Sequence, residues 1–224
     1  MTHRLIALAA LATLAWSGSV VGQEFITLAP TTWVNDITPD GTVVAGTGPG
    51  GGFYWRWQED PAPTYIGGND AVALSDDGSV LVGCIQDPVL DREVAARWTE
   101  ATGWVSLGWL PNAQSCPSRS NAYDVSGDGT MVVGLSWDGC SGRGFLWTAA
   151  TGMQELTNLV NGNNRASAIA GNGSIIGGFA QGSFDRTPAL WDTDLTGSVY
   201  DADLVGEIYG FSEDGSIILG NLSG

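Results

Sequence analysis

Two aspartates occupy positions where carboxylate chemistry can be built. Asp36 and Asp124 each come directly before the first apolar residue of a segment that recurs along the chain. If those segments line a channel, both carboxylates can lie near its mouth, and a carboxylate pair is what glycoside hydrolysis requires. Only two of the five copies carry this aspartate, which favours a solvated or turn-capping role. Asp36 and Asp124 are thus the catalytic candidates for a polysaccharide-active hydrolase or lyase, and turn capping is the favoured alternative.

Other residues of common catalytic machinery are scarce. The one histidine is His3, the chain has no lysine, and eight arginines oppose 24 acidic residues, for a net charge of −16. Once His3 is removed with a leader, no histidine is left for a Ser-His-Asp triad or a zinc site. A Schiff base is excluded because the chain has no lysine. Such acidity also disfavours nucleic acid as a partner. We expect no cofactor and no metal site, and the balance favours a protein without catalytic activity.

Tryptophans in the connections suggest a binding site instead. Trp109 and Trp137 fall in connecting segments, with Arg119 between them in the chain. Exposed tryptophan suits stacking on sugar rings, and binding residues concentrate in connections. The alternative is packing within long connections, because large aromatic side chains are mostly buried. Trp109, Trp137 and Arg119 are the candidate contacts for an extracellular glycan or protein ligand.

A ten-residue segment that occurs five times must position all of these residues. Its copies are ITPDGTVVAG (37–46), LSDDGSVLVG (74–83), VSGDGTMVVG (125–134), IAGNGSIIGG (169–178) and FSEDGSIILG (211–220). Asp-Gly and Asn-Gly favour tight hairpin turns, in which glycine takes a positive φ without steric cost. The short apolar run that follows suits a buried strand. Each copy therefore predicts strand, hairpin and strand, and the acids of the turns form no calcium loop.

A tryptophan strand follows each of the first four copies. The predicted column is Trp57, Trp98, Trp147 and Trp191, and we expect these side chains to pack between neighbouring sheets. A further turn and a short fourth strand come next. Four short strands per repeat at this period are typical of a propeller or another repeat array. The sequence thus predicts an all-β, propeller-like array of four-stranded units, about five in number, with the last incomplete.

The combined motifs resemble a known family. A-x-x-(V/I/L)-S-x-D-G-(S/T)-x-x-x-G, a later (A/F)-x-W-T and then T-G-(M/W)-x-x-L are similar to the HAF-family extracellular repeat of bacterial secreted proteins. The similarity covers nearly the whole chain after Thr32. The first copy departs from it with a proline-rich turn, and the fourth has Asn172 in place of aspartate. The resemblance implies an extracytoplasmic propeller-like array and brings no catalytic residues with it.

The first 22 residues resemble a secretory signal peptide. His3 and Arg4 give a positive start, residues 5–16 are apolar, and residues 20–22 are small enough for cleavage. The apolar run is shorter than the ~20 residues of a membrane-spanning helix, although a retained anchor is the alternative. We expect a mature chain from Gln23, without a membrane span, that is secreted to the periplasm or the extracellular space.

The domain organisation follows from the repeats. Residues 23–224 form the repeat domain, with units near 34–66, 71–110, 121–160, 166–205 and 208–224. Residues 24–28 resemble a last strand without the rest of its blade. Either the ring closes imperfectly with about five blades, or this chain is shorter than the natural unit, and we favour the second.

Three cysteines complete the candidate residues. Cys116 precedes the first strand of the third unit and Cys140 follows its second strand, so one hairpin brings both to the same end of the blade. In an oxidising compartment this predicts a Cys116–Cys140 disulfide, which would contribute roughly 3 kcal/mol. Cys84 is expected to be a small buried hydrophobe.

These residues together predict an exported, non-enzymatic repeat domain that binds a glycan or protein ligand. Two alternatives stay open. One is the hydrolase or lyase that uses channel carboxylates. The other is a passenger or stalk part of a larger surface protein.

Overall fold

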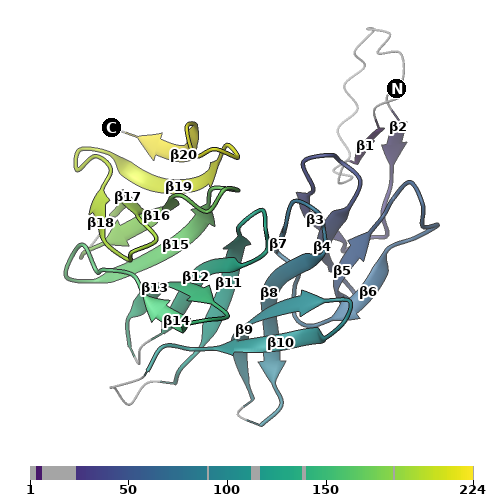
Figure 1. The fold of residues 1–224 in the computed structure, drawn as a ribbon, viewed down its shortest axis with the longest axis horizontal. Helices are drawn as coiled ribbons and strands as arrows, with labels where there is room; N and C mark the ends of the chain where they lie inside the picture. The colour runs from purple at the N-terminus through teal and green to yellow at the C-terminus, as the bar shows by residue number, and fades with distance from the viewer. Residues whose placement is uncertain are drawn as a thin grey trace, which may run out of the picture.

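The computed structural model describes residues 4–6, 24–89, 91–111, 117–137, 140–183 and 185–223. Every helix or strand assigned in this part of the chain is a β-strand. Four sheets have four antiparallel strands each, in chain order, and of the two further sheets of two strands the C-terminal one continues the series. We number these sheets units 1 to 5; they follow one another around an open arc (Figure 1). The predicted all-β array with an incomplete last unit is confirmed.

Each unit takes its strands from one continuous stretch of the chain. Unit 1 contains β3 (Trp33–Ile37), β4 (Val44–Gly48), β5 (Gly51–Trp55) and β6 (Thr64–Gly67). Unit 2 contains β7 (Ala73–Leu74), β8 (Val80–Asp87), β9 (Arg92–Thr99) and β10 (Gly103–Gly108). Unit 3 contains β11 (Ser120–Val125), β12 (Met131–Trp137), β13 (Gly142–Thr148) and β14 (Gly152–Glu155). Unit 4 contains β15 (Asn163–Ile169), β16 (Ile176–Gln181), β17 (Arg186–Trp191) and β18 (Gly197–Val199), and unit 5 contains β19 (Val205–Phe211) and β20 (Ile218–Ser223).

The hairpin turn between first and second strands is the same in every unit. Its glycine has a φ between 66° and 72° in all five copies, as the Asp-Gly and Asn-Gly pairs predict. In unit 3, Ser126 Oγ donates a hydrogen bond to Asp128 Oδ1 (2.7 Å) and accepts one from the Met131 N–H (3.0 Å). Units 1, 2 and 5 repeat this arrangement, whereas unit 4 has Ala170 in place of the hydroxyl residue. The turn acids are therefore structural groups.

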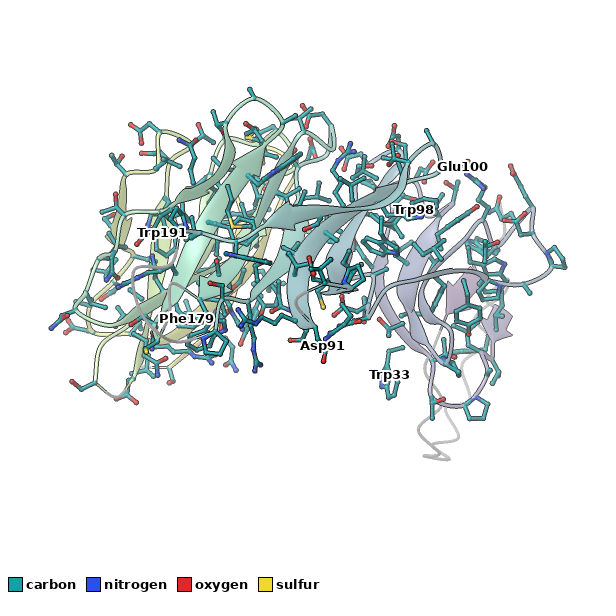
Figure 2. All side chains as sticks on the ribbon, turned by 90° about the horizontal axis from the view of Figure 1, so that it is seen from below. Trp33, Asp91, Trp98, Glu100, Phe179 and Trp191 are labelled. Carbon is teal, nitrogen blue, oxygen red and sulfur yellow. The ribbon has the colours of Figure 1, made fainter. Side chains whose placement is uncertain are left out.

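The hydrophobic core lies between the units. Successive units bury apolar side chains against one another, so each of three core clusters draws on two neighbouring sheets. Trp191, 1% exposed, packs between units 3 and 4, and Trp98 packs between units 1 and 2. Figure 2 shows both tryptophans within the layer of sheets, whereas Trp33, 53% exposed, extends away from it. Burial of the tryptophan column between sheets is the arrangement that the repeat predicts.

The predicted tryptophan column is wrong in unit 1. The residue that pairs with Val132 of unit 3 is Trp147, and the residue that pairs with the equivalent Val44 is Trp55. Trp55 therefore takes the place that we expected for Trp57, which follows the end of β5. Both side chains are buried in the same cluster, with Val44 and Phe53.

The closing glycine of each copy is needed for a close approach, but inside its own sheet. A Cβ on Gly134 would overlap the Asn121 carbonyl oxygen of β11, the first strand of the same unit. Gly46 and Gly178 are in the same position relative to β3 and β15. A glycine in a strand often marks a close approach of another backbone, and here that backbone is the neighbouring strand of the same sheet.

The N-terminal strands sit at one end of the arc. β1 (Arg4–Ile6) pairs with β2 (Glu24–Ile26) in parallel, and Ile26 and Leu28 pack on the outer face of unit 1, over Trp55 and Trp57. In Figure 1 this end and β20 are separated, so residues 24–28, which resemble the last strand of a blade, do not pair with unit 5. No helix that could cross a membrane occurs among the described residues.

Candidate functional site

A central channel is the place where all five units meet. The first strands β3, β7, β11, β15 and β19 face the inside of the arc (Figure 1). Residues of these strands and of the turns after them line a cavity of about 520 Å³. A cavity of this size can hold a small ligand or a protruding segment of a larger one. Both catalytic candidates, Asp36 and Asp124, are among its lining residues.

Bulges in the first strands supply one channel residue in each of units 1, 3, 4 and 5. The pairing register shifts between Val34 and Asp36 in unit 1, and at the equivalent positions of units 3, 4 and 5. A bulge leaves one residue unpaired and re-aims its side chain. The residues at this position are Asn35, Tyr123, Ser167 and Tyr209, and Val72 holds it in unit 2. All five line the channel, and we call them the channel ring.

The channel ring was not predicted from the sequence. The signal that could have found it is positional, because each member lies two residues before the first apolar residue of its copy. The scaffold around this position repeats, while the five side chains differ in size and polarity. Apolar, aromatic, amide and hydroxyl groups thus share one wall of the channel.

Asp36 and Asp124 connect neighbouring units. Asp36 Oδ1 accepts a hydrogen bond from the Ile37 N–H, and its Oδ2 accepts one from the Leu74 N–H of unit 2 (both 2.8 Å). Asp124 does the same in unit 3, with Val125 and with Ile169 of unit 4 (both 2.8 Å). Each carboxylate therefore already holds two backbone donors across a junction between units.

The channel raises the pKa of both aspartates. Burial raises the pKa of Asp124 to about 7, against the two backbone hydrogen bonds that lower it, and the charge of Asp36 adds to the rise. Burial likewise raises the pKa of Asp36, with a smaller contribution from Asp76. The pKa of Glu213 is also raised, by desolvation first and by Asp76 next. The channel wall thus carries acids that hold protons more tightly than free carboxyl groups.

The hairpin turns join around one end of the channel. The Asp76 N–H donates to the Gly127 carbonyl of the next unit (2.9 Å), and the Gly127 N–H donates to Gly171 (2.8 Å). Asn172 continues the series with the Glu213 carbonyl of unit 5 (2.9 Å). The equivalent residue of unit 1 is Pro39, which has no N–H to donate. The turn bonds therefore run from unit 2 to unit 5.

A buried charge cluster fixes unit 5 on unit 4. Glu207 of β19, 1% exposed, accepts hydrogen bonds from Arg165 Nε (3.1 Å) and Arg186 Nη1 (2.8 Å). Both guanidinium groups lie over the ring of Phe179, at 5.1 and 4.3 Å from its centroid. Figure 2 shows Phe179 in the same half of the molecule as Trp191. A buried carboxylate is tolerated here because two cations compensate it.

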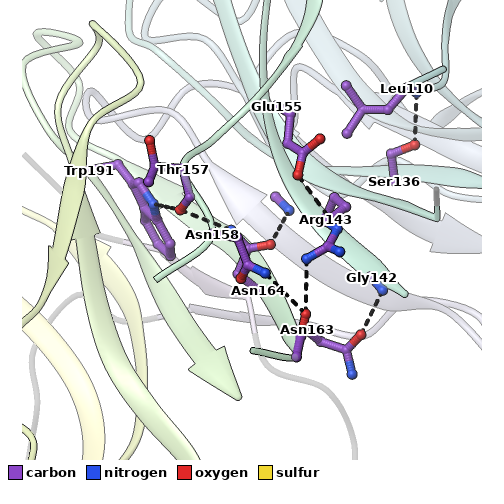
Figure 3. Close-up of polar contacts among 12 residues, drawn as sticks. Leu110, Ser136, Gly142, Arg143, Glu155, Thr157, Asn158, Asn163, Asn164 and Trp191 are labelled. Atoms are coloured by element: carbon purple, nitrogen blue, oxygen red, sulfur yellow. Dashed lines mark hydrogen bonds and ion pairs between the residues drawn. The ribbon is translucent and has the colours of Figure 1, made fainter. Parts of the chain in front are cut away.

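The structure brings the three predicted ligand contacts to one end of unit 3. The Trp137 N–H donates to the Arg119 carbonyl (2.9 Å), and the N–H of Leu110, next to Trp109, donates to Ser136 Oγ (2.9 Å; Figure 3). Arg119 is exposed, whereas Trp109 and Trp137 are half-buried. β12 runs from the hairpin turn to Trp137, so these residues lie at the opposite end of the unit from that turn.

Polar contacts continue from this end of unit 3 into unit 4. Asn163 Oδ1 accepts a hydrogen bond from the Gly142 N–H (2.8 Å), and Arg143 Nη1 donates to the Gly162 carbonyl (2.9 Å). Trp191 Nε1 donates to the Thr157 carbonyl (2.9 Å), as Figure 3 shows. Neighbouring units are thus joined by backbone bonds between their hairpin turns, and units 3 and 4 are joined in addition by contacts that involve side chains.

The cysteines and the acids are the remaining groups that could take part in redox or metal chemistry. Cys84 is a free, buried thiol, and burial raises its pKa to about 12, so it is inert. Cys116 lies outside the described residues, and its disulfide with Cys140 stays a prediction. Among the described residues, no three His, Cys, Asp or Glu side chains are grouped to hold a metal ion.

Comparison with known proteins supports the fold. No protein-family model and no curated protein sequence matches this chain. Its structure is similar to that of TolB from Acinetobacter baumannii, with 12% identity, a TM-score of 0.55, and coverage of 84% of this chain and 53% of that one. A functionally unknown protein from Desulfotomaculum acetoxidans DSM 771 is 16% identical, with a TM-score of 0.50 and coverage of 88% and 64%.

The chain therefore spans about half of one of these structures and under two thirds of the other. At such identities the structural similarity shows only the fold, a TolB-like, propeller-like repeat. It gives no information about activity. The resemblance to the HAF family has no matching family model behind it and stays a proposal.

Proposed function

We propose that this chain is an exported, non-enzymatic binding domain that holds an extracellular glycan or protein ligand at its central channel. The observation that carries the proposal is the channel ring, because every unit places the same repeat position in one cavity, and four of the five have a bulge there. Tyr123 and Tyr209 supply aromatic faces, and Asn35 and Ser167 supply hydrogen-bonding groups. Aromatic faces beside a few polar groups suit a sugar ring or a protein loop.

The carboxylates favour binding over catalysis. A glycosidase needs one carboxyl group that is free to protonate the leaving oxygen and a second that faces the sugar or a water. In the channel, both oxygens of Asp36 and of Asp124 accept backbone hydrogen bonds within or between units. These bonds give the two side chains a structural task that competes with a catalytic one.

Export and family membership are parts of the same proposal. The apolar leader of residues 1–22, the acidic composition and the motif similarity to HAF-family repeats support an extracellular or periplasmic location. A role as the passenger or stalk of a larger surface protein is compatible with the same features. The intact mass of the protein from its native host distinguishes a separate binding domain from a part of a larger protein.

The test is a glycan-array screen with the full chain, followed by calorimetry on the best ligand. A Tyr123→Ala/Tyr209→Ala variant is expected to bind roughly tenfold more weakly, because each lost aromatic contact costs about 0.5–1.5 kcal/mol. Tyr200→Ala is the matched control, since Tyr200 is 51% exposed and follows β18, the fourth strand of unit 4.

Other outcomes assign the function elsewhere. Unchanged affinity in the double tyrosine variant, with a loss in Trp109→Ala/Trp137→Ala, would move the site to the connections of unit 3. Product release from a polysaccharide panel that Asp124→Asn abolishes would establish the hydrolase or lyase and remove the binding-only proposal.

A further inference from the structure

A groove between units 1 and 2 lies apart from the channel. It has a volume of about 450 Å³ and is lined by the hairpin turn of unit 2, at Gly78 and Ser79, and by residues at the ends of β5 and β9. No described residue lines both this groove and the channel. The groove is large enough for a small ligand or for one residue of a polymer.

Two aromatic side chains meet in the groove. The rings of Tyr54 in unit 1 and Trp98 in unit 2 both line it, and their centroids are 5.2 Å apart. The residues in the position of Tyr54 at the next two junctions are Arg97 and Leu146, in the same register with the second strand. Of these three junctions, the aromatic pair is therefore specific to the one between units 1 and 2.

Trp98 has a hydrogen-bond donor without an acceptor. The indole N–H of Trp55 donates to the Asp60 carbonyl (3.0 Å), and that of Trp191 donates to the Thr157 carbonyl (2.9 Å). Trp98 is only 9% exposed, yet its indole N–H donates to no group in the described part of the chain. Buried donors normally have a partner. A ligand with an oxygen acceptor would supply the one that Trp98 lacks.

A donor and an acceptor face each other at the same groove. Arg56 of unit 1 and Glu100 of unit 2 are 3.7 Å apart, with side chains 41% and 76% exposed, and both line the groove. Figure 2 shows Glu100 in the same half of the molecule as Trp98. An ion pair this long and exposed stabilises the fold little, so its two groups are available to a ligand.

The Arg56 guanidinium marks the place of a ligand ring. It lies over Tyr54, 4.9 Å from the ring centroid. Cation–π contacts at exposed sites are weak. A flat, partly apolar group can therefore displace the guanidinium from this face of Tyr54 and keep it as a hydrogen-bond donor at its side.

We propose that the groove binds a neutral sugar residue of an extracellular glycan. The apolar face of the pyranose ring packs on Tyr54, and Arg56 and Glu100 serve adjacent hydroxyl groups as donor and acceptor. The Trp98 N–H donates to a sugar oxygen. A neutral sugar fits better than a uronic acid, because the chain has a net charge of −16 and Asp77 lines the groove beside Glu100. This site is additional to the channel, and either proposal stands without the other.

The experiment is saturation-transfer NMR with the full chain and single sugars as probes. The neutral probes are the methyl glycosides of glucose, galactose, mannose and N-acetylglucosamine, and the acidic probes are glucuronic and galacturonic acid. We expect saturation transfer to at least one neutral sugar and a weaker effect with the acids. A titration of the best probe then gives the affinity of each variant.

Two pairs of variants locate the sugar. Tyr54→Leu/Arg56→Thr gives unit 1 the residues that unit 3 has at these positions, and it should weaken binding at least tenfold. Its control is Tyr123→Ala/Tyr209→Ala, which changes the channel only and should bind normally. Trp98→Phe keeps an aromatic ring without the N–H and should bind about tenfold more weakly. Trp191→Phe is its control, because that N–H already has an acceptor.

Circular dichroism of all four variants checks that the fold is preserved. Three results would overturn the inference: no saturation transfer to any neutral probe, tighter binding of a uronic acid, or unchanged affinity in Tyr54→Leu/Arg56→Thr. A loss of binding confined to Tyr123→Ala/Tyr209→Ala would also overturn it, and would place the sugar in the channel in support of the proposed function.

Discussion

Unit 3 and unit 5 share one ten-residue segment but lie in opposite surroundings. Their turns match in detail, with 2.7 Å from Ser126 Oγ to Asp128 Oδ1 and 2.7 Å from Ser212 Oγ to Asp214 Oδ1. The strands after the turns differ, since Val133 is fully buried and the equivalent Leu219 is 67% exposed. The turn is therefore a local property of the segment, whereas burial is supplied by the strands and units on either side.

The largest expected difference between the two units is in the core. Phe145 is fully buried opposite Gly134, and Phe145→Ala should lower the free energy of unfolding by about 3–5 kcal/mol. Leu219→Ala in unit 5 should change it by less than about 0.5 kcal/mol, because the side chain is already in water. Chemical denaturation followed by tryptophan fluorescence measures both. Similar losses would mean that unit 5 is covered in solution.

The closing glycines should give a smaller contrast. A Cβ on Gly134 would overlap the Asn121 carbonyl and lie 2.8 Å from Phe145 ring atoms. A Cβ on Gly220 would lie 2.8 Å from the Glu207 carbonyl of β19 and would meet no aromatic ring among its three nearest atoms. Gly134→Ala should cost about 1–3 kcal/mol through overpacking, and Gly220→Ala less. Thermal melts of the two variants measure which substitution costs more stability. A greater loss in Gly220→Ala than in Gly134→Ala would contradict the prediction.

Asp124 makes the stability of unit 3 depend on pH in a way that unit 5, with Gly210 at this position, does not share. Its pKa is about 7 in the fold and about 4 in an unfolded chain, so the folded state holds the proton more tightly. Unfolding free energy from this group should therefore fall as pH rises from about 4 to 7, and level off above.

Asp124→Asn should remove that part of the pH dependence, measured by denaturation at several pH values. Asp128→Asn is the control of opposite sign. Hydrogen bonds from Ser126 and Thr130 lower the pKa of Asp128, so its contribution to stability is lost as pH falls below about 4. Identical slopes for the wild type and Asp124→Asn between pH 4 and 7 would refute the assignment.

The smallest effect should be the same in both units. Ser126→Ala and Ser212→Ala each remove the hydroxyl that bridges the turn, at a cost of about 1 kcal/mol. Hydrogen exchange at the amides of Met131 and Ile217, which both donate to that hydroxyl, measures the loss locally. Unequal protection would show that the turn also depends on its neighbours.

Local features of this fold could be predicted from the sequence, and features set by distant contacts could not. The Asp-Gly turns were predictable because Gly129 and its equivalents act within four residues. Trp57 was predicted for the tryptophan column in place of Trp55 because the two lie only two residues apart, and the pairing of Trp55 with Val44 is what separates them. The partners of Asp36 and Asp124 lie 38 and 45 residues further along the chain, so their role as connectors left no local signal. The bulge at Tyr123 is likewise visible only in the register of two strands.

The series of bonds between hairpin turns makes certain amides report on docking rather than on folding. The N–H groups of Asp76, Gly127 and Asn172 are held by carbonyls of the following unit, so they exchange with solvent when two units part, even if each sheet stays intact. Ladder amides within a sheet need that sheet to open. The difference between the two exchange rates would therefore measure, junction by junction, how firmly the arc keeps its curvature. Pro39 has no N–H, so the junction between units 1 and 2 lacks such an amide. Exchange of these amides can therefore be measured at the junctions between units 2 and 3, 3 and 4, and 4 and 5.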